Sequence, residues 1–339
     1  MEEWLMQKNV TASDVARALG MSQSTVSRVF TPGASVSAKT RKKVLEAAQQ
    51  MGYRPNAIAR SLITKKSNMI GIVMGDVKNP FYPNVLSMFS RELGKKGYHL
   101  LFVNTKNNQI SDDEIFQLCE YNVEGIIITD ALLTSSLASY FKDKQIPIVM
   151  FNRYEQNSLF HAVSCDNIDG GYQIGKYLLT KGHRHLAFIS GNPNTSTSHD
   201  RKKGFQEALQ ESGYTYTTEY GDYTYEGSYQ ATLRLLKSAL PLDAIFCAND
   251  IMALGAIDAA KEIGVRIPED VSIIGFDDID LAAWSAYSLT TWKQPVNKMI
   301  AATIELLLKH IEKPEQNNLI IYKSIKGSLV ERKTVMDRH

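Results

Sequence analysis

The sequence predicts an α/β protein in which a small helical head precedes a two-lobed core that holds two parallel sheets. Capped amphipathic helices fill the first 54 residues, and from Met69 onward short apolar runs alternate with amphipathic helical segments. Polar side chains follow most of the apolar runs. With 339 residues and 44% hydrophobic content, the chain is long enough for a head and two further lobes with a large core.

The first predicted helix begins after Thr11, which can cap it. Asp14 stands three positions later, at the spacing of a capping box. The apolar face at helical spacing consists of Val15, Ala16 and Leu19. Gly20 can take the left-handed conformation that ends a helix, so the sequence predicts a tight turn there.

The second predicted helix begins after Ser22, and its inward face is Val26 and Val29. The side chains on its exposed face can all form hydrogen bonds; they are Gln23, Ser24, Ser27 and Arg28. In a helix-turn-helix the second helix enters the major groove of DNA, where Gln can pair with adenine and Arg with guanine. On this segment alone, an ordinary helical hairpin with a polar face remains an alternative.

A third helix follows Ser37, and its predicted buried stripe is Val44, Leu45, Ala48 and Met51. Four cations near its start oppose the helix dipole: Lys39, Arg41, Lys42 and Lys43. A nearby polyanion would favour this placement, whereas a solvated charged face is the alternative. Residues 1–66 hold eleven Lys or Arg against four Asp or Glu, and the remainder holds 27 against 32. These net charges of +7 and −5 predict that one end of the chain neutralises phosphates.

Composition and motifs argue against several other classes of protein. The start, MEEWLMQKN, has no basic or apolar region typical of an export signal, and no apolar run approaches eighteen residues. A soluble cytoplasmic protein without a membrane partner is therefore expected. The three cysteines lie far apart in apolar stretches, which favours small buried residues over a metal or redox site; they are Cys119, Cys165 and Cys247.

No motif indicates an enzyme, a catalytic residue, a metal site or a cofactor. The segment 170–177 contains GxxxxGK, but Tyr177 replaces the Ser or Thr that would hold Mg²⁺, and the segment lies within a helical pattern. The sequence has no GxSxG, HExxH or paired CxxC motif. The spacing of His183 and His185 is typical of a strand entry rather than a zinc site.

Eight apolar runs are predicted strands: 69–75, 98–104, 124–129, 146–151, 162–166, 185–191, 243–250 and 271–277. Irregular connections follow Phe151 and Asp277, so we expect the chain to cross between the lobes at these two points. A last helix at about 296–312 and a strand-like segment at 319–333 then complete the lobes.

Because open parallel sheets bind ligands beyond the carboxyl ends of their strands, the residues after each run are informative. They are polar or aromatic: Asp76, Asn79, Pro80, Phe81, Tyr82, Asn152, Arg153, Asp166, Asn167, Asn249, Asp250, Asp277 and Asp278. Amides, carboxylates, an arginine and aromatic faces together suit a polyhydroxylated ligand such as a sugar. For each residue alone, a helix N-cap is the alternative interpretation.

Over nearly its whole length the chain resembles the LacI/GalR family of bacterial transcription regulators. The resemblance is carried by TASDVARALGMSQSTVSRV, VSAKTRKKVLEAAQQMGYRPNAIARSL, KGHRHLAFISG, AIFCANDIMALGAI and SIIGFDDI. It implies a helix-turn-helix DNA-binding domain at 1–54, a hinge helix and linker at 55–67, and an effector-binding and dimerisation core at 68–339 that is similar to periplasmic sugar-binding proteins. The lobes are expected at about 68–154 plus 293–318 (N-lobe) and at about 155–292 plus 319–339 (C-lobe).

The resemblance and the exposed chemistry of the second helix together predict the residues that contact DNA: Thr11, Ser22, Gln23, Ser24, Thr25, Ser27, Arg28, Asn56, Ala59 and Leu62. Gln23, Ser24 and Arg28 fall at base-contacting positions of the family's recognition helix. Leu62 matches the hinge residue that wedges between base steps in the minor groove. A segment as short as 56–62 does not form a stable helix alone, so its order should depend on DNA and on a dimer mate.

The resemblance also implies an effector site made of Phe81, Asn152, Arg201, Tyr223, Asn249, Asp277 and Gln294. The implied function is a homodimeric repressor that binds near-palindromic operator DNA under the control of a sugar-like effector between the core lobes. A dimer is expected because no leucine heptads of the kind that form tetramers follow LVERKT.

Three alternatives remain at this stage. A corepressor type that responds to a purine or a phosphorylated metabolite would use the same parts. A sugar-binding transport component would need an export signal and would have no use for residues 11–62. A sugar kinase with a DNA-binding head would need a phosphate-cradling loop and Mg²⁺ ligands.

Overall fold

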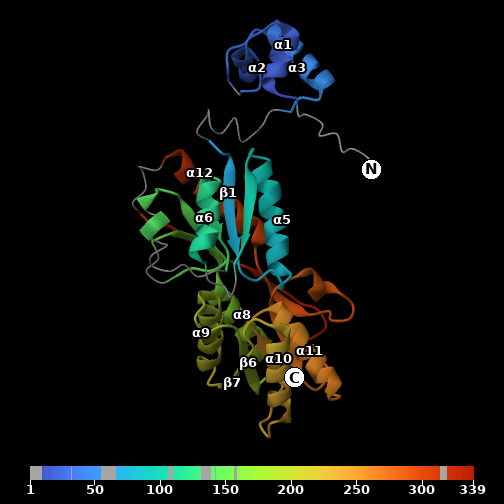
Figure 1. Cartoon of the computed structure of the whole chain (residues 1–339). Helices are drawn as coiled ribbons and strands as arrows, with labels where there is room; N and C mark the ends of the chain where they lie inside the picture. The colour runs from blue at the N-terminus through green and yellow to red at the C-terminus, as the bar shows by residue number, and fades with distance from the viewer. Residues whose placement is uncertain are drawn as a thin grey trace. The chain divides into compact units, whose positions relative to one another are not determined.

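The computed structural model describes residues 10–31, 33–54, 66–105, 110–130, 139–141, 143–155, 159–313 and 319–339. The chain divides into two compact units, Met1–Ser67 and Asn68–His339, which we call the head and the core (Figure 1). Within the described ranges, no helix has both the length and the apolar character needed to cross a membrane.

The head consists of three helices, α1 (Ala12–Leu19), α2 (Gln23–Val29) and α3 (Ala38–Met51). The predicted capping box of α1 is present, and Gly20 ends α1 in the left-handed conformation with φ 62°. Ser22 and Ser37 cap α2 and α3 by accepting the backbone N–H three residues later. The buried core of the head is apolar and comes from all three helices: Val15, Ala16, Val26, Val29 and Val44.

One prediction for α3 was wrong, and one of its cations has a structural partner. Leu45 is 45% exposed, whereas its neighbour Val44 is fully buried, because successive helical residues point about 100° apart and only one of the two can face the core. Arg41 is half-buried, and its guanidinium donates to the carbonyl oxygens of Val29 at 2.8 Å and Ala34 at 3.5 Å. This cation therefore satisfies the C-terminal end of α2 and is not a free surface charge.

The first sheet of the core is entirely parallel, with the strand order β11-β5-β4-β3-β1-β2. Its strands are β1 (Met69–Met74), β2 (His99–Asn104), β3 (Gly125–Ile128), β4 (Ile148–Phe151), β5 (His161–Cys165) and β11 (Tyr322–Ile325). On one face, α5 (Phe81–Gly94) and α12 (Val296–Glu312) pack against residues such as Ile72, and on the other face α6 (Asp112–Glu120) packs against residues such as Val73. We call this part of the core the N-lobe.

The second sheet has the strand order β12-β10-β9-β8-β6-β7, and only β12 runs antiparallel, against β10. Its strands are β6 (Leu186–Ser190), β7 (Tyr216–Tyr220), β8 (Ala244–Cys247), β9 (Ser272–Asp277), β10 (Thr290–Lys293) and β12 (Ser328–Val330). Its helices are α8 (Asn167–Thr180), α9 (Ser196–Gln210), α10 (Tyr225–Lys237), α11 (Asp250–Glu262) and the 3-10 turn η1 (Asp280–Ala283). The helices pack in pairs, α8 with α9 and α10 with α11, and we call this part the C-lobe.

The lobes divide the chain differently from the prediction. Strand β5 pairs with β4, so the chain first crosses to the C-lobe after Cys165 rather than after Phe151. The second crossing follows Lys293, because β10 pairs with β9; this agrees with the expected lobe boundary near 292–293 but not with the expected crossing after Asp277. A third crossing follows Ile325, since β11 pairs with β5. The strands β5 and β11, expected in the C-lobe, therefore belong to the N-lobe sheet.

The GxxxxGK segment lies inside α8, as its helical pattern predicts. Glycines on both helices allow close packing of α8 against α9: a Cβ on Gly171 of α8 would meet the carbonyl oxygen of Arg201, and a Cβ on Gly204 of α9 would meet that of Ile168. These glycines bring two helices together and do not form a phosphate-binding loop. Of the three cysteines, Cys165 and Cys247 are buried as expected, whereas Cys119 is only half-buried.

Candidate functional site

The outer surface of α2 presents the side chains predicted to read DNA. The exposed residues are Gln23, Ser24 and Arg28, and the half-buried residues are Thr25 and Ser27. Val26 and Val29 are buried in the core of the head. The polar face of the helix is therefore free to enter a major groove.

Thr11 and Ser22 hold the ends of the helices. Thr11 Oγ1 donates to Asp14 Oδ2 at 2.7 Å, and Ser22 Oγ accepts the backbone N–H of Thr25 at 3.2 Å. Both residues are exposed, so contacts of their side chains with phosphates remain a prediction. Asn56, Ala59 and Leu62 of the predicted hinge lie outside the described residues.

Most of the predicted effector residues meet in a cleft between the two lobes of the core. The cleft is lined by Asp76, Asn79, Phe81, Tyr82, Asn152 and Arg153 of the N-lobe and by Thr197, Arg201, Tyr223, Asn249 and Asp277 of the C-lobe. Every predicted effector residue except Gln294 is among them. The convergence follows from the fold, because the carboxyl ends of parallel strands in each sheet face the same side.

Arg201 forms the C-lobe floor of the cleft and is only 2% exposed. Its Nε donates to Asn167 Oδ1 at 2.9 Å, and its Nη1 donates to the carbonyl oxygen of Ala248. Its Nη2 lies 3.5 Å from Asp277 Oδ1, and its guanidinium carbon lies 3.6 Å from the centroid of the Phe276 ring. These contacts fix the guanidinium in one orientation and leave Asp277 facing the cleft.

Asp277 is the most perturbed acid that lines the cleft. Burial raises the pKa of its carboxyl to about 6, although the charge of Arg201 and the hydrogen bond from Gln294 favour the ionised form. Gln294 Nε2 donates to Asp277 Oδ1 at 2.7 Å. Gln294 therefore lies behind Asp277 and orients it, and it is not among the residues that line the cleft. Its direct contact with an effector stays a prediction.

The N-lobe wall of the cleft is held by Asp130, a residue that the sequence analysis missed. Its buried carboxylate accepts the backbone N–H groups of Gly75 and Asp76, both at 2.7 Å. Its carbonyl oxygen accepts Arg153 Nη1 at 2.7 Å. Asp130 thus positions both the loop after β1 and the arginine after β4.

Arg153 reaches toward the opposite lobe, and its guanidinium carbon lies 5.5 Å from the centroid of the Tyr223 ring. Tyr223 Oη lies 2.8 Å from Thr197 Oγ1. The sequence analysis missed Thr197 because it lies on a helix rather than directly after a strand. Thr197 precedes Arg201 by four residues, so both lie on one face of α9. This spacing could have identified Thr197 as a cleft residue from the sequence.

Buried polar atoms without a partner mark the cleft as a binding site. Asn152 Oδ1, Arg153 Nε and, just behind the cleft, Gln294 Oε1 make no hydrogen bond in the part of the chain that the structure describes. Such atoms are costly when buried unless a ligand or water pairs with them.

The backbone of the cleft is strained at three lining residues. Asn152, Tyr223 and Asp277 have φ values of 70°, 58° and 123°. Non-glycine residues seldom adopt these conformations, and such residues concentrate at ligand sites. The strain indicates that the surrounding structure holds these side chains in place.

The cleft holds a cavity of only about 20 Å³. That volume has room for roughly one water molecule. A sugar needs more space, so binding requires the lobes to separate or the lining side chains to move.

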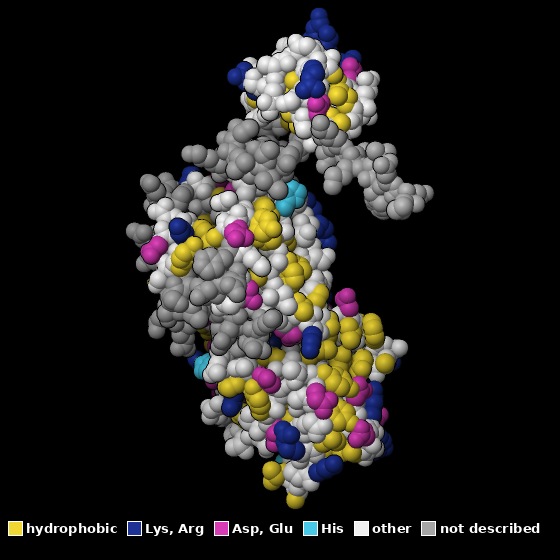
Figure 2. All heavy atoms as spheres, in the orientation of Figure 1, with side chains coloured by type: hydrophobic (Ala, Val, Ile, Leu, Met, Phe, Trp, Pro, Cys, Tyr) yellow, Lys and Arg dark blue, Asp and Glu magenta, His cyan; other side chains and the backbone are white. Residues whose placement is uncertain are grey.

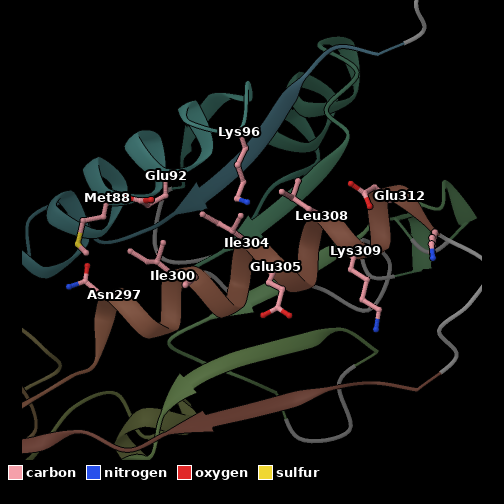
Figure 3. Close-up of a pocket in the computed structure, with 12 residues that line it drawn as sticks. Met88, Glu92, Lys96, Asn297, Ile300, Ile304, Glu305, Leu308, Lys309 and Glu312 are labelled. Carbon is pink, nitrogen blue, oxygen red and sulfur yellow. The ribbon is translucent and has the colours of Figure 1, made fainter. Parts of the chain in front are cut away.

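A larger groove lies on the N-lobe between α5 and α12, with a cavity volume of about 740 Å³ (Figure 3). Its floor is apolar and includes Met88, Ile300 and Ile304, and charged side chains such as Glu92 and Lys309 lie along its rim. Among the described residues, those that line the groove come from α5, α12 and the positions just after these helices, and none comes from the carboxyl end of a strand. The convergence of buried polar groups favours the smaller cleft as the effector site.

Comparison with known proteins identifies the family to which the chain belongs. Residues 11–56 match the family described as bacterial regulatory proteins, lacI family, and residues 176–335 match a periplasmic binding protein-like domain. The chain is 34% identical to catabolite control protein A of Priestia megaterium over 92% of its own length and 96% of that protein.

Solved structures resemble the chain over nearly its whole length. The lac repressor dimer bound to operator and the anti-inducer ONPF has a TM-score of 0.86 and 26% identity, over 97% of this chain and all of that one. The complex of the transcriptional regulator CelR with cellobiose has a TM-score of 0.71 and 27% identity, over 96% of this chain and all of that one. The chain therefore belongs to the LacI family of bacterial DNA-binding regulatory proteins.

Proposed function

We propose that this chain is a homodimeric repressor whose affinity for operator DNA is controlled by a small polyhydroxylated effector, most simply a sugar, bound between the core lobes. The observation that carries the proposal is the cleft itself. Both lobes contribute buried polar side chains to it, so a ligand there contacts the two lobes at once. A ligand of that kind has different contacts when the lobes change their relative orientation.

The chemistry of the cleft supports a neutral effector. Two arginines, Arg153 and Arg201, are balanced by the carboxyl groups of Asp76 and Asp277, so no excess of positive charge is available to a phosphate. The amide oxygen of Asn152, which has no partner among the described residues, can accept a hydrogen bond from a ligand hydroxyl. Phe81, Tyr82 and Tyr223 supply aromatic faces for a sugar ring. The bound cellobiose in the similar CelR structure is consistent with this class.

Exposed apolar surface supports a homodimer. Hydrophobic side chains gather on one face of the C-lobe (yellow in the lower part of Figure 2), and exposed apolar residues of that lobe include Tyr225, Ile263 and Trp284. Trp284 is 57% exposed. Contiguous apolar surface of this kind is typical of a protein interface, and the similar lac repressor structure is a dimer.

The mechanism follows from differential affinity. An effector that binds one arrangement of the lobes more tightly shifts the population toward it, and the heads of a dimer then fit two operator half-sites better or worse. We propose that effector binding lowers the affinity for operator DNA and so relieves repression. In a corepressor mechanism the same coupling would raise that affinity.

The decisive experiment measures DNA affinity with and without metabolites. An operator is first selected from random duplexes with the full chain, and fluorescence anisotropy then measures its Kd in a panel of sugars, sugar phosphates and purine bases. We expect a neutral sugar to weaken binding about tenfold or more. A response to purines or sugar phosphates alone would replace the proposed effector class, and no response to any compound would overturn the allosteric proposal.

A matched pair of variants assigns the response to the cleft. Phe81→Leu removes an aromatic face from the cleft, whereas Phe102→Leu alters an exposed ring on the edge strand β2. We expect Phe81→Leu to raise the sugar concentration needed for half-maximal response and Phe102→Leu to leave it unchanged. Equal effects would place the effector elsewhere.

A further inference from the structure

Tyr154 joins the two lobes at a point beside the cleft. It follows Arg153 in the segment after β4, in the N-lobe, and its backbone N–H donates to Ser196 Oγ at 3.0 Å. Its hydroxyl donates to Asp200 Oδ2 at 2.8 Å. Both acceptors belong to α9 of the C-lobe, so both hydrogen bonds exist only while the lobes are together.

The ring of Tyr154 is anchored in its own lobe. It packs against the ring of Tyr322 in β11, with centroids 4.7 Å apart. The Tyr322 hydroxyl in turn lies 2.8 Å from Ser164 Oγ in β5. The side chain therefore has its body fixed to the N-lobe and its polar end in contact with the C-lobe.

The carboxylate that receives this hydroxyl is a strong acceptor. Asp200 is buried, and its other oxygen, Oδ1, lies 3.3 Å from His199 Nδ1. A hydrogen bond to a buried carboxylate is about twice as strong as one between neutral groups. Separation of the lobes leaves Asp200 without the hydroxyl unless water replaces it.

The contact shares its elements with the cleft but not its lining residues. On α9, Ser196 and Asp200 are four residues apart and contact Tyr154, whereas the adjacent pair Thr197 and Arg201 lines the cleft. On the N-lobe side, Arg153 lines the cleft and Tyr154 does not. Movement of the cleft walls thus moves the contact, although a ligand in the cleft need not touch it.

We propose that Tyr154 is a positioning residue whose hydrogen bonds to Ser196 and Asp200 stabilise the closed arrangement of the two lobes whether or not the cleft is occupied. We call these two hydrogen bonds the latch. The latch sets the equilibrium between closed and open lobes, and hence how readily the cleft admits a ligand. Its consequence for an effector rests on the proposed function, but the latch itself can be tested without effector or DNA.

The test measures the distance between the lobes in the full chain. Nitroxide spin labels are placed at Lys78→Cys on the N-lobe and Glu226→Cys on the C-lobe, two exposed positions, in a Cys119→Ser background. Double electron–electron resonance then gives the distribution of distances between the two labels in the absence of ligand. In the labelled chain with Tyr154 intact, we expect most molecules to show the short distance between labels that corresponds to closed lobes.

Tyr154→Phe removes the hydroxyl and keeps the ring on Tyr322. We expect the closed-to-open ratio to fall roughly tenfold, the equivalent of one charge-assisted hydrogen bond. Tyr322→Phe is the matched control, because it removes a hydrogen bond of equal length from the same ring pair within one lobe. It should leave the distance distribution unchanged even if it lowers the melting temperature.

Asp200→Asn keeps an acceptor and provides the second test. It should shift the distribution in the same direction as Tyr154→Phe but less, and it should add little in the double variant. An unchanged distribution in Tyr154→Phe, or equal shifts in Tyr154→Phe and Tyr322→Phe, would overturn the latch. Either result would leave the proposed effector function intact, and a failed metabolite panel would leave the latch intact.

Discussion

At the scale of single residues, Asp277 has a property that can be measured directly. It is a buried acid whose pKa is raised to about 6 against an ordinary value of 3.8. Between these two values the folded chain binds a proton that the unfolded chain has released. This group therefore lowers the free energy of unfolding as the pH rises from about 4 to about 6.

Asp277→Asn should remove this dependence. Because the asparagine does not titrate, the difference in unfolding free energy between the original chain and the variant should move in favour of the variant as the pH rises across that range. Urea denaturation at several pH values measures the difference. A difference in unfolding free energy that stays constant, or that moves in favour of the original chain, would show that the pKa of Asp277 is not raised in the folded chain. The difference is needed because burial also raises the pKa of Asp76 and Asp250.

Arg28 is an exposed side chain on the polar face of α2, with the geometry expected of a base reader. Arg28→Ala should cost about 1 to 3 kcal/mol of operator affinity and relax the preference at one base pair. Binding to a set of singly substituted operators measures both effects. Gln50→Ala, exposed in α3, is the control. Equal loss on every operator variant would assign Arg28 to phosphate.

At the scale of elements, the head shows how one cation can differ from its neighbours. Arg41→Ala removes the donor that satisfies the end of α2 and should destabilise the head by about 1 kcal/mol. Lys43→Ala, at an exposed position, should leave stability within about 0.5 kcal/mol. Hydrogen exchange of α2 amides in the full chain measures this. Equal protection in both variants would contradict the capping role of Arg41.

The elements also show what the sequence could predict. The caps of α1 and α2 and the span of α12 were predicted correctly, because each depends on residues within a few positions of one another. The strands β7 and β10 were missed, since TYTTEY and TTWK are largely polar and have no apolar run. A strand of that kind is stabilised by its neighbours in the sheet rather than by its own sequence.

At the scale of the whole molecule, the cleft was predictable and the division into lobes was not. Parallel strands bring their carboxyl ends to one edge of each sheet, so polar residues such as Asn152 in the N-lobe and Asp277 in the C-lobe collect at the ligand-binding edge of their own sheet. The sheet to which β5 belongs depends on pairing with β4 and β11, which no local pattern of 161–165 reveals. The roles of Asp130 and Tyr154 depend in turn on that packing.

The independence of the two units gives a prediction for the whole chain. Deletion of residues 1–67 should abolish binding to operator DNA and leave any sugar affinity of the core unchanged, because every lining residue of the cleft lies in Asn68–His339. Anisotropy and calorimetry on the truncated chain measure the two affinities. Loss of sugar binding together with DNA binding would show that the head contributes to the effector site.

The small volume of the closed cleft has a kinetic consequence. If a sugar enters only after the lobes part, the observed rate of binding should rise with sugar concentration and then level off at the rate of opening. Stopped-flow fluorescence, using Trp292 beside the interlobe crossings and the other tryptophans as reporters, can resolve such a plateau. The inverse of the plateau rate is the time that the lobes take to open, and it sets the shortest time in which the protein can respond to an effector.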